Sequence, residues 1–178
     1  IQLWEPQGGT AVTTLRGTLG AVLDVAFSAD GCNVLGAGSD NAIRLWDVAT
    51  GRVKHTMTGH AEKVCGVEFS PTQSARAASC AQDRTVKLWD LAKGYNARTT
   101  MCTSNCNDVC YALDGSFVCS AHFDGKLRFW DPSSGAAILQ EVHAHASQAT
   151  GVCAVPGGNE ILSVGRDHSL RLLDVRSG

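Results

Sequence analysis

The sequence predicts an all-β fold in which four-stranded antiparallel sheets fan around an axis as the blades of a partial β-propeller. Two observations predict this fold. An aspartate recurs at a nearly constant interval, 43, 41 and 43 residues apart, at Asp40, Asp83, Asp124 and Asp167. Between the aspartates, short runs alternate polar and apolar residues, which is typical of half-buried strands, and no window shows a helical period. Four short strands in every unit of about 42 residues are the pattern of a propeller blade.

The strand after each aspartate is the clearest element. Polar and apolar residues alternate up to a closing aspartate in the runs NAIRLWD (41–47), RTVKLWD (84–90), GKLRFWD (125–131) and HSLRLLD (168–174). A polar turn follows each of them, in WDVATG, WDLAKG, WDPSSG and LDVRSG, and WEPQGG matches these turns near the start of the chain. The repetition of one turn after one kind of strand indicates a single repeated unit.

Three further strands complete each unit. The first strand runs into a turn and is expected at 22–31 (VLDVAFSADG) and 64–73 (VCGVEFSPTQ). The second precedes the aspartate and is expected at 33–38 (NVLGAG), 75–80 (ARAASC), 117–122 (FVCSAH) and 161–166 (ILSVGR). The fourth is expected at 52–59 (RVKHTMTG) and 136–143 (AAILQEVH).

The composition is that of an ordinary protein surface. The 178 residues include 15 Lys plus Arg and 17 Asp plus Glu, for a net charge of −2 and a pI of about 6.3. This balance favours neither a nucleic-acid-binding footprint nor an acidic tail. No apolar run approaches the roughly 20 residues of a membrane-spanning helix. We expect no nucleic-acid partner and no transmembrane segment of its own, in a cytoplasmic protein that can be recruited to membranes.

The cysteines predict neither disulfides nor a metal site. Most of the eight occupy strand positions that suit a small apolar residue, so we expect reduced thiols in an intracellular protein. Cys102, Cys106 and Cys110 recur every four residues, but no second pair follows at a usual zinc-site interval. Strand alternation predicts that Cys106 and Cys110 share a face, where core packing explains Cys110. No phosphate-binding loop and no cysteine with a paired base is evident, so no cofactor is expected.

The repeats carry a specific resemblance. The unit that contains TMTGH (56–60) and KLWD (87–90) resembles a WD40 repeat, and the likeness extends over the whole chain. The resemblance implies a buried hydrogen-bond network in which the turn aspartate binds a histidine, the histidine meets a hydroxyl, and the hydroxyl accepts the tryptophan N–H. The matching residues are His60, Ser79, Asp83 and Trp89.

Those residues also include the Ser, His and Asp of a catalytic triad. We favour the structural interpretation, because a triad does not recur at every repeat and the hydroxyl is expected to face the tryptophan. The sequence thus predicts no catalytic residues and a protein that is not an enzyme. The other repeats depart from the pattern, with Thr18 and Asn105 in place of His60, Gly36 in place of Ser79 and Leu173 in place of Trp89.

In WD40 propellers each repeat donates its first strand to the preceding blade, and the ring commonly has seven blades. On that basis, we expect whole blades at 18–57, 60–101 and 105–142, a three-stranded blade at 145–178 that ends in a turn at Gly178, and the last two strands of an earlier blade at 1–15. The chain would therefore hold about four to five blades of the ring. It begins with IQLW inside an expected strand, so we expect a fragment of a longer protein.

Several segments resemble the C-terminal WD40 domain of the autophagy-related protein 16 family more closely than a general repeat. They are HTMTGHAEKV (55–64), DRTVKLWDL (83–91), CTSNCNDVC (102–110), SAHFDGKLRFWD (120–131) and SVGRDHSLRLLDVR (163–176). This resemblance implies a scaffold whose propeller directs lipid conjugation of a ubiquitin-like protein to membranes. The implied partners are the autophagy conjugation machinery or membrane-associated adaptors, with homodimerisation through a coiled coil outside this chain. The alternative is a substrate-receptor or signalling subunit of another multiprotein assembly.

Propellers of this family commonly bind partners on the rim of the central channel. The positions expected to be exposed there include Phe123, Arg166, Gln82 and Asn107, together with Ser39, Gly20, Val22, Glu62, Val64, Val109, Ser147 and Ala149. Phe123 is the main candidate, because a large aromatic side chain in a polar turn is typical of a binding anchor. The alternative is that Phe123 packs on a neighbouring blade. Arg166 could pair with an acidic group or be solvated.

Overall fold

The computed structural model describes residues 1–133, 138–157 and 160–175. All regular structure in these residues is β, which confirms the predicted all-β fold. The strands are β1 (Gln2–Trp4), β2 (Ala11–Thr14), β3 (Val22–Phe27), β4 (Asn33–Gly38), β5 (Ile43–Asp47), β6 (Val53–Met57), β7 (Val64–Phe69), β8 (Arg76–Ala81), β9 (Thr85–Asp90), β10 (Tyr95–Met101), β11 (Cys106–Tyr111), β12 (Val118–His122), β13 (Lys126–Trp130), β14 (Ile138–His143), β15 (Ala149–Ala154), β16 (Glu160–Gly165) and β17 (Leu170–Asp174).

Antiparallel hydrogen bonding joins the described strands into five sheets, in the orders β1–β2, β3–β4–β5–β6, β7–β8–β9–β10, β11–β12–β13–β14 and β15–β16–β17. Each sheet is a meander, because strands that follow one another in the chain are also hydrogen-bonded neighbours. The expected end of the last unit at Gly178 lies outside the described residues.

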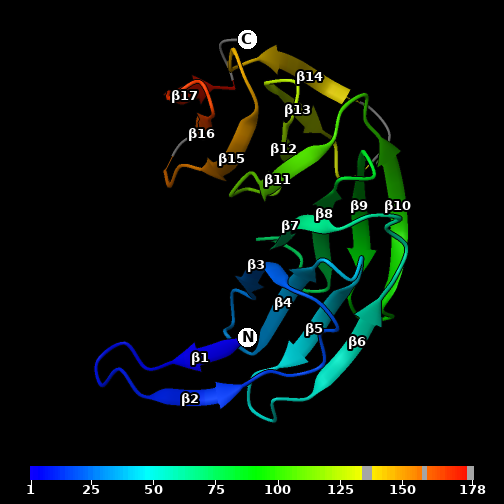
Figure 1. Ribbon diagram of the computed structural model, residues 1–178, viewed down its shortest axis with the longest axis vertical. Helices are drawn as coiled ribbons and strands as arrows, with labels where there is room; N and C mark the ends of the chain where they lie inside the picture. Colours follow the sequence, from blue (N-terminus) through cyan, green and yellow to red (C-terminus); the bar gives the residue numbers. More distant parts are fainter. Residues whose placement is uncertain (134–137, 158–159, 176–178) are drawn as a thin grey trace.

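The sheets follow one another along an open arc, which is the propeller arrangement that the repeats predict (Figure 1). The first strands β3, β7, β11 and β15 line the concave side, and the last strands β6, β10 and β14 lie on the convex side. Neighbouring sheets contact each other through these first strands, β3 with β7, β7 with β11 and β11 with β15.

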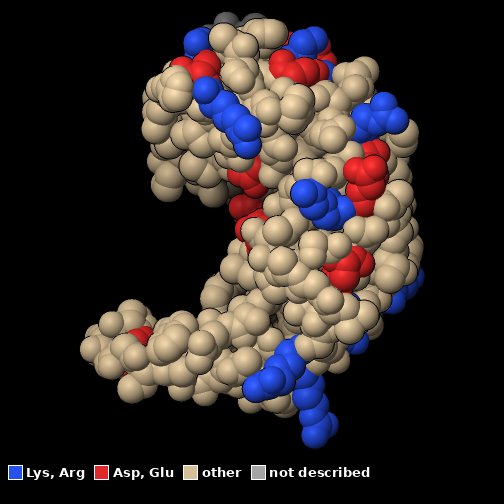
Figure 2. Space-filling model, viewed as in Figure 1, with Lys and Arg blue, Asp and Glu red and all other residues tan. Residues whose placement is uncertain are grey.

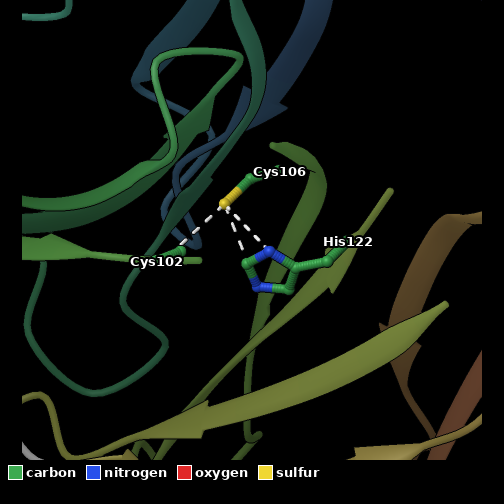
Figure 3. A group of neighbouring side chains, drawn as sticks. All are labelled: Cys102, Cys106 and His122. Atoms are coloured by element: carbon green, nitrogen blue, oxygen red, sulfur yellow. Dashed lines mark hydrogen bonds between the residues drawn. The ribbon is translucent and has the colours of Figure 1, made fainter. Parts of the chain in front are cut away.

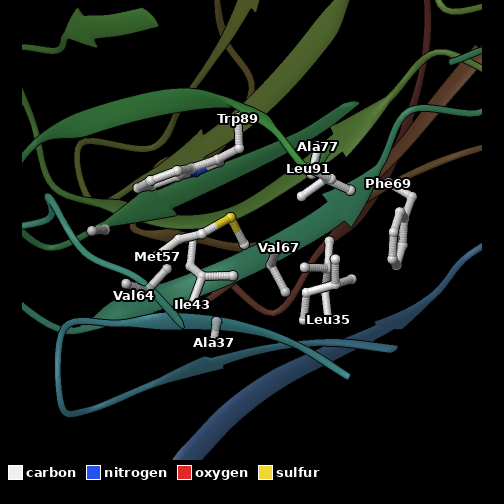
Figure 4. Close-up of a cluster of buried hydrophobic side chains, with 12 residues drawn as sticks. Leu35, Ala37, Ile43, Met57, Val64, Val67, Phe69, Ala77, Trp89 and Leu91 are labelled. Atoms are coloured by element: carbon white, nitrogen blue, oxygen red, sulfur yellow. The ribbon is translucent and has the colours of Figure 1, made fainter. Parts of the chain in front are cut away.

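Apolar side chains fill the boundaries between successive sheets. Between the β3–β6 and β7–β10 sheets, Leu35 and Ile43 from one side pack with Val67, Phe69 and Trp89 from the other (Figure 4). Two further clusters occupy the next two boundaries along the arc. Each large side chain buried in this way contributes about 1.5–3 kcal/mol to stability, so the boundaries hold the arc together.

A bulge near the start of each innermost strand changes which face its residues occupy. The register of β11 with β12 shifts between Cys106 and Asp108, and equivalent shifts occur in β3, β7 and β15. The prediction that Cys106 and Cys110 share a face is therefore wrong. Cys106 packs toward the β7–β10 sheet, whereas Cys110 packs toward the β15–β17 sheet. The extra residue of a bulge reverses the alternation of side chains beyond it.

Candidate functional site

Four turns of similar construction lie at the same end of their sheets, because each joins the second and third strands of a sheet with the same topology. We call this end of the molecule the rim face and define it by the turns at 39–41, 82–84, 123–125 and 166–168. The loop that leads into each sheet is hydrogen-bonded to its turn. The N–H of Ala61 donates to Asp83 at 2.9 Å, for example, and that of Ala146 donates to Asp167 at 3.0 Å.

The β7–β10 sheet contains the four-residue network that the resemblance implies. His60 Nδ1 lies 2.9 Å from Asp83 Oδ2, and His60 Nε2 lies 2.8 Å from Ser79 Oγ. Trp89 Nε1 donates to the same Ser79 oxygen at 2.8 Å. The Thr85 hydroxyl donates to the other carboxylate oxygen of Asp83 at 2.7 Å. The network links the loop before β7 to β8 and β9, and it leaves the buried carboxylate fully paired.

The electrostatics of this network favour an ionised aspartate beside a neutral histidine. Burial acts to raise the pKa of Asp83, but the hydrogen bonds from Thr85, from the Ala61 N–H and from His60 outweigh it and lower that pKa. Burial lowers the pKa of His60, although Asp83 opposes the shift. A neutral imidazole with its proton on Nδ1 donates to the carboxylate and leaves Nε2 to accept the Ser79 proton.

The β15–β17 sheet has the same network without the indole. His145 lies 3.0 Å from Asp167 through Nδ1 and 2.9 Å from the Ser163 hydroxyl through Nε2. Leu173, which takes the tryptophan position, packs against the apolar cluster next to this sheet. The histidine, hydroxyl and aspartate therefore assemble without the fourth member.

The β11–β14 sheet replaces the missing histidine with one that sequence reasoning missed. Trp130 Nε1 donates to Ser120 Oγ at 2.7 Å, as in the complete network. The partner of that hydroxyl is His122, whose Nε2 lies 2.8 Å away and which is fully buried. His122 comes from β12, whereas His60 comes from the preceding loop, so alignment of the repeats does not reveal it. Its position two residues after Ser120 on the same strand is the available signal.

An arginine takes over the pairing of the turn aspartate in that sheet. The Arg128 guanidinium is 1% exposed and lies 2.7 Å from Asp124 and 2.7 Å from Glu141. It also donates to the Thr103 hydroxyl at 2.8 Å. Although burial acts to raise the pKa of Asp124, the hydrogen bond from Arg128 lowers it on balance. This ion pair fixes the turn that carries Phe123.

In the β3–β6 sheet, a backbone carbonyl of the preceding loop replaces the missing hydroxyl as the acceptor for the tryptophan N–H. Trp46 Nε1 donates to the Arg16 carbonyl oxygen at 2.9 Å. A Cβ on Gly36 would lie only 2.9 Å from the Trp46 ring, so the indole occupies the space that a serine would need. Gly36 is therefore required by the close approach of the Trp46 ring and of Ile1, whose Cδ1 would lie 2.8 Å from that Cβ.

The predicted rim residues differ in their exposure to solvent. Phe123 is 55% exposed and Arg166 is exposed, whereas Gln82 and Asn107 are partly buried. The Asn107 amide donates to the Ala149 carbonyl at 2.7 Å, which ties β11 to the next sheet. Of the wider set, Ser39, Gly20, Glu62 and Ser147 are exposed and Val22 is partly buried.

Three positions of the wider set were expected to be exposed, and this expectation is wrong. The structure buries Val64, Val109 and Ala149. They lie on the innermost strands, and their side chains point into the boundaries between sheets. A position counted from the repeat fixes the place in the sheet, but packing between sheets decides where the side chain points, and for Val109 the bulge between Cys106 and Asp108 also shifts the alternation.

Three carboxylates that were not predicted connect successive innermost strands. Asp24 accepts the N–H of Val67 at 2.8 Å, Glu68 accepts that of Tyr111 at 2.5 Å, and Asp108 accepts that of Val152 at 2.8 Å. Acidic side chains gather on the concave side of the arc in Figure 2. Burial raises the pKa of Glu68 to about 7, that of Asp108 to about 6 and that of Asp24 in the same direction. Through these hydrogen bonds, the three carboxylates link each sheet to the next.

A second unpredicted cluster consists of Cys102, Cys106 and His122, whose potential ligand atoms all lie within 4.8 Å of one another (Figure 3). The Cys106 thiol donates to Cys102, and this hydrogen bond lowers the pKa of the Cys102 thiol. Among the described residues, this is the group whose donor atoms suit a metal ion.

Comparison with known proteins identifies the family. Residues 9–47, 51–90 and 97–131 match the family model described as WD domain, G-beta repeat. The chain belongs to the WD40 family.

Three known proteins are similar to most of the chain. The chain is 45% identical to autophagy-related protein 16 of Arabidopsis thaliana over 177 residues, which is 99% of the chain and 35% of that protein. It is 38% identical to protein tipD of Dictyostelium discoideum over 179 residues, which is 99% of the chain and 29% of that protein. It is 30% identical to nuclear distribution protein PAC1 of Arthroderma benhamiae over 162 residues, 85% of the chain and 35% of that protein. The chain thus spans about a third of these relatives.

Proposed function

We propose that this WD40 chain is a non-enzymatic docking platform which, as in autophagy-related protein 16, directs lipid conjugation of a ubiquitin-like protein to membranes. The identity of 45% over 99% of the chain supports the assignment. Its partners would be proteins of the conjugation machinery or adaptors at membranes, met in the cytoplasm. No helix that could cross a membrane occurs in the part of the chain that the structure describes.

The network chemistry favours docking over catalysis. The Ser79 hydroxyl is fully buried, and both His60 and Trp89 lie within hydrogen-bond distance of it. A nucleophilic serine needs access to its substrate, and this oxygen has none. The arrangement recurs around His145, as expected for a structural element of a repeated fold.

Phe123 is the observation that carries the docking proposal. Phe123 is 55% exposed, while its backbone N–H donates a hydrogen bond to the Asn105 carbonyl at 3.0 Å and so holds the turn in place. The next residue, Asp124, is clamped by Arg128. An exposed aromatic side chain on a rigid turn can bury apolar area against a partner with little loss of conformational entropy.

The test replaces Phe123 with alanine in the purified protein and measures partner capture and thermal stability together. We expect capture of the conjugation machinery to fall at least about tenfold, as for an interface anchor, with the melting temperature unchanged. The matched control is Tyr95→Ala, since Tyr95 is a similarly exposed aromatic (48%) on the convex strand β10, away from the rim face. Equal capture by wild type and Phe123→Ala, with a lower melting temperature in the variant, would make Phe123 a packing residue.

A further inference from the structure

Cys102, Cys106 and His122 converge from three segments on one buried point. Cys102 follows β10, Cys106 opens β11 and His122 ends β12. The Cys106 sulfur lies 3.7 Å from the Cys102 sulfur and 3.5 Å from His122 Nδ1. All three side chains are buried. Figure 3 shows Cys106 facing both the imidazole ring and Cys102.

We propose that these three residues bind a structural zinc ion. Zinc bonds of about 2.3 Å to sulfur and about 2.0–2.1 Å to nitrogen, in tetrahedral geometry, place two thiolates about 3.8 Å apart and a thiolate about 3.5 Å from an imidazole nitrogen. The separations of 3.7 and 3.5 Å match these values, but the Cys106 sulfur also lies 3.9 Å from Nε2, so the imidazole would have to rotate to direct Nδ1 at the ion. The Ser104 carbonyl oxygen, which lies 3.2 Å from His122 Nδ1 and accepts its proton when Nδ1 is protonated, would be released to take the fourth position once Nδ1 binds the ion.

The charge of the site favours a divalent thiophilic ion such as zinc over a monovalent one. Two thiolates neutralise a divalent cation, so the loaded site adds no net charge to a buried, largely apolar environment. Monovalent copper with the same ligands would leave a buried negative charge. The surrounding side chains include Ala78, Cys80, Val86 and Val118, which exclude water from the site. Three side-chain ligands with the Ser104 carbonyl in the fourth position would leave no position open to water, which is the condition for a structural zinc site.

The hydrogen bonds around His122 are compatible with metal binding through Nδ1. Ser120 Oγ lies 2.8 Å from Nε2, so an Nε2 proton can be donated to it. The Ser120 hydroxyl can in turn donate to the Arg128 carbonyl at 3.4 Å while it accepts the Trp130 N–H. With its proton on Nε2, the imidazole would leave Nδ1, which lies 3.5 Å from the Cys106 sulfur and 3.2 Å from the Ser104 carbonyl oxygen, free to bind the ion. A second hydrogen bond that orients a histidine is typical of metal ligands.

The location gives the ion a structural role. Asn105 stands in this repeat where His60 stands in the preceding one, so the loop before β11 lacks its histidine link to the sheet. An ion held by Cys102, Cys106 and His122 would join that loop to β11 and β12. It would also tie the end of β10 to the next sheet, across a boundary between blades.

The test uses the purified protein, kept reduced and stripped of metal with a chelator. Titration with Co²⁺ should give the near-ultraviolet thiolate-to-cobalt band and the intense visible bands of tetrahedral cobalt, saturating at one equivalent. Zn²⁺ should displace the cobalt and raise the melting temperature. Free Zn²⁺ at 100 times its Kd should increase the folded-to-unfolded ratio about 100-fold. Cys102→Ala and Cys106→Ala should abolish both effects.

The matched control is Cys110→Ala, which removes another buried thiol from the same strand but from its opposite face. It should bind one Co²⁺ as the wild type does. If wild type shows neither the cobalt band nor stabilisation by zinc, the proposal is overturned. This test does not depend on the folding of any variant. Equal binding in Cys106→Ala would place the metal elsewhere. Binding of Cu⁺ without Zn²⁺ or Co²⁺ would refute the zinc assignment.

Discussion

Replacement of Ser79 with alanine removes one oxygen on which two other buried side chains depend. His60 Nε2 and Trp89 Nε1 each lie 2.8 Å from Ser79 Oγ. Neither group can reach solvent, because Ser79 and Trp89 are 0% exposed and the His60 side chain is buried. The substitution therefore changes little volume but leaves two polar groups without a partner.

The expected loss of stability follows from those two groups. A buried donor or acceptor that loses its partner costs about 1–3 kcal/mol. The two losses share one network and do not add fully, so we expect Ser79→Ala to lower the free energy of unfolding by about 2–4 kcal/mol. Urea unfolding at neutral pH, followed by tryptophan fluorescence, measures the difference directly.

The exposed Ser74 provides the control, since Ser74→Ala should change the free energy of unfolding by less than about 0.5 kcal/mol. A change of that small size in Ser79→Ala would refute the reasoning. It would mean that Trp89 finds another acceptor, as Trp46 does at the Arg16 carbonyl.

Three further predictions concern other contacts. The folded-state pKa of Glu68, about 7, lies above its unfolded value of about 4.5, so its contribution to stability is fully present below pH 4.5 and is lost as the pH rises through 7. Glu68→Gln keeps an acceptor for the Tyr111 N–H but does not titrate. The urea midpoint of the variant should therefore rise relative to that of wild type as the pH increases from about 5 to about 8. Gly36→Ala should cost about 1–3 kcal/mol in urea unfolding, since its Cβ would lie 2.9 Å from the Trp46 ring; an unchanged midpoint would show that the ring moves freely. Arg128→Lys should lose about 1–3 kcal/mol, because one ammonium cannot bridge both carboxylates, and calorimetry at neutral pH should show a lower melting temperature.

The candidate site could be predicted only where its residues keep the spacing of the repeat. His60, Ser79, Asp83 and Trp89 lie at fixed positions of one unit, and their hydrogen bonds follow the pattern of the family. His122 escaped prediction because it lies on β12 beside Ser120, whereas the histidine of the repeat comes from the loop before the sheet. The same reasoning excluded a metal site, since it counted intervals among cysteines and not the imidazole that the neighbouring strand brings beside them.

The amino-acid sequence by itself determined the strands, their grouping into units of about 42 residues and the propeller class, because alternation and turn chemistry are local properties of the chain. The exposure of each rim residue was decided only in the tertiary structure. In the tertiary structure Val64 and Val109 point into the boundaries between sheets, and Cys106 lies beside Cys102 and His122. Bulges and packing between sheets depend on contacts between segments far apart in the chain, and no local pattern records them.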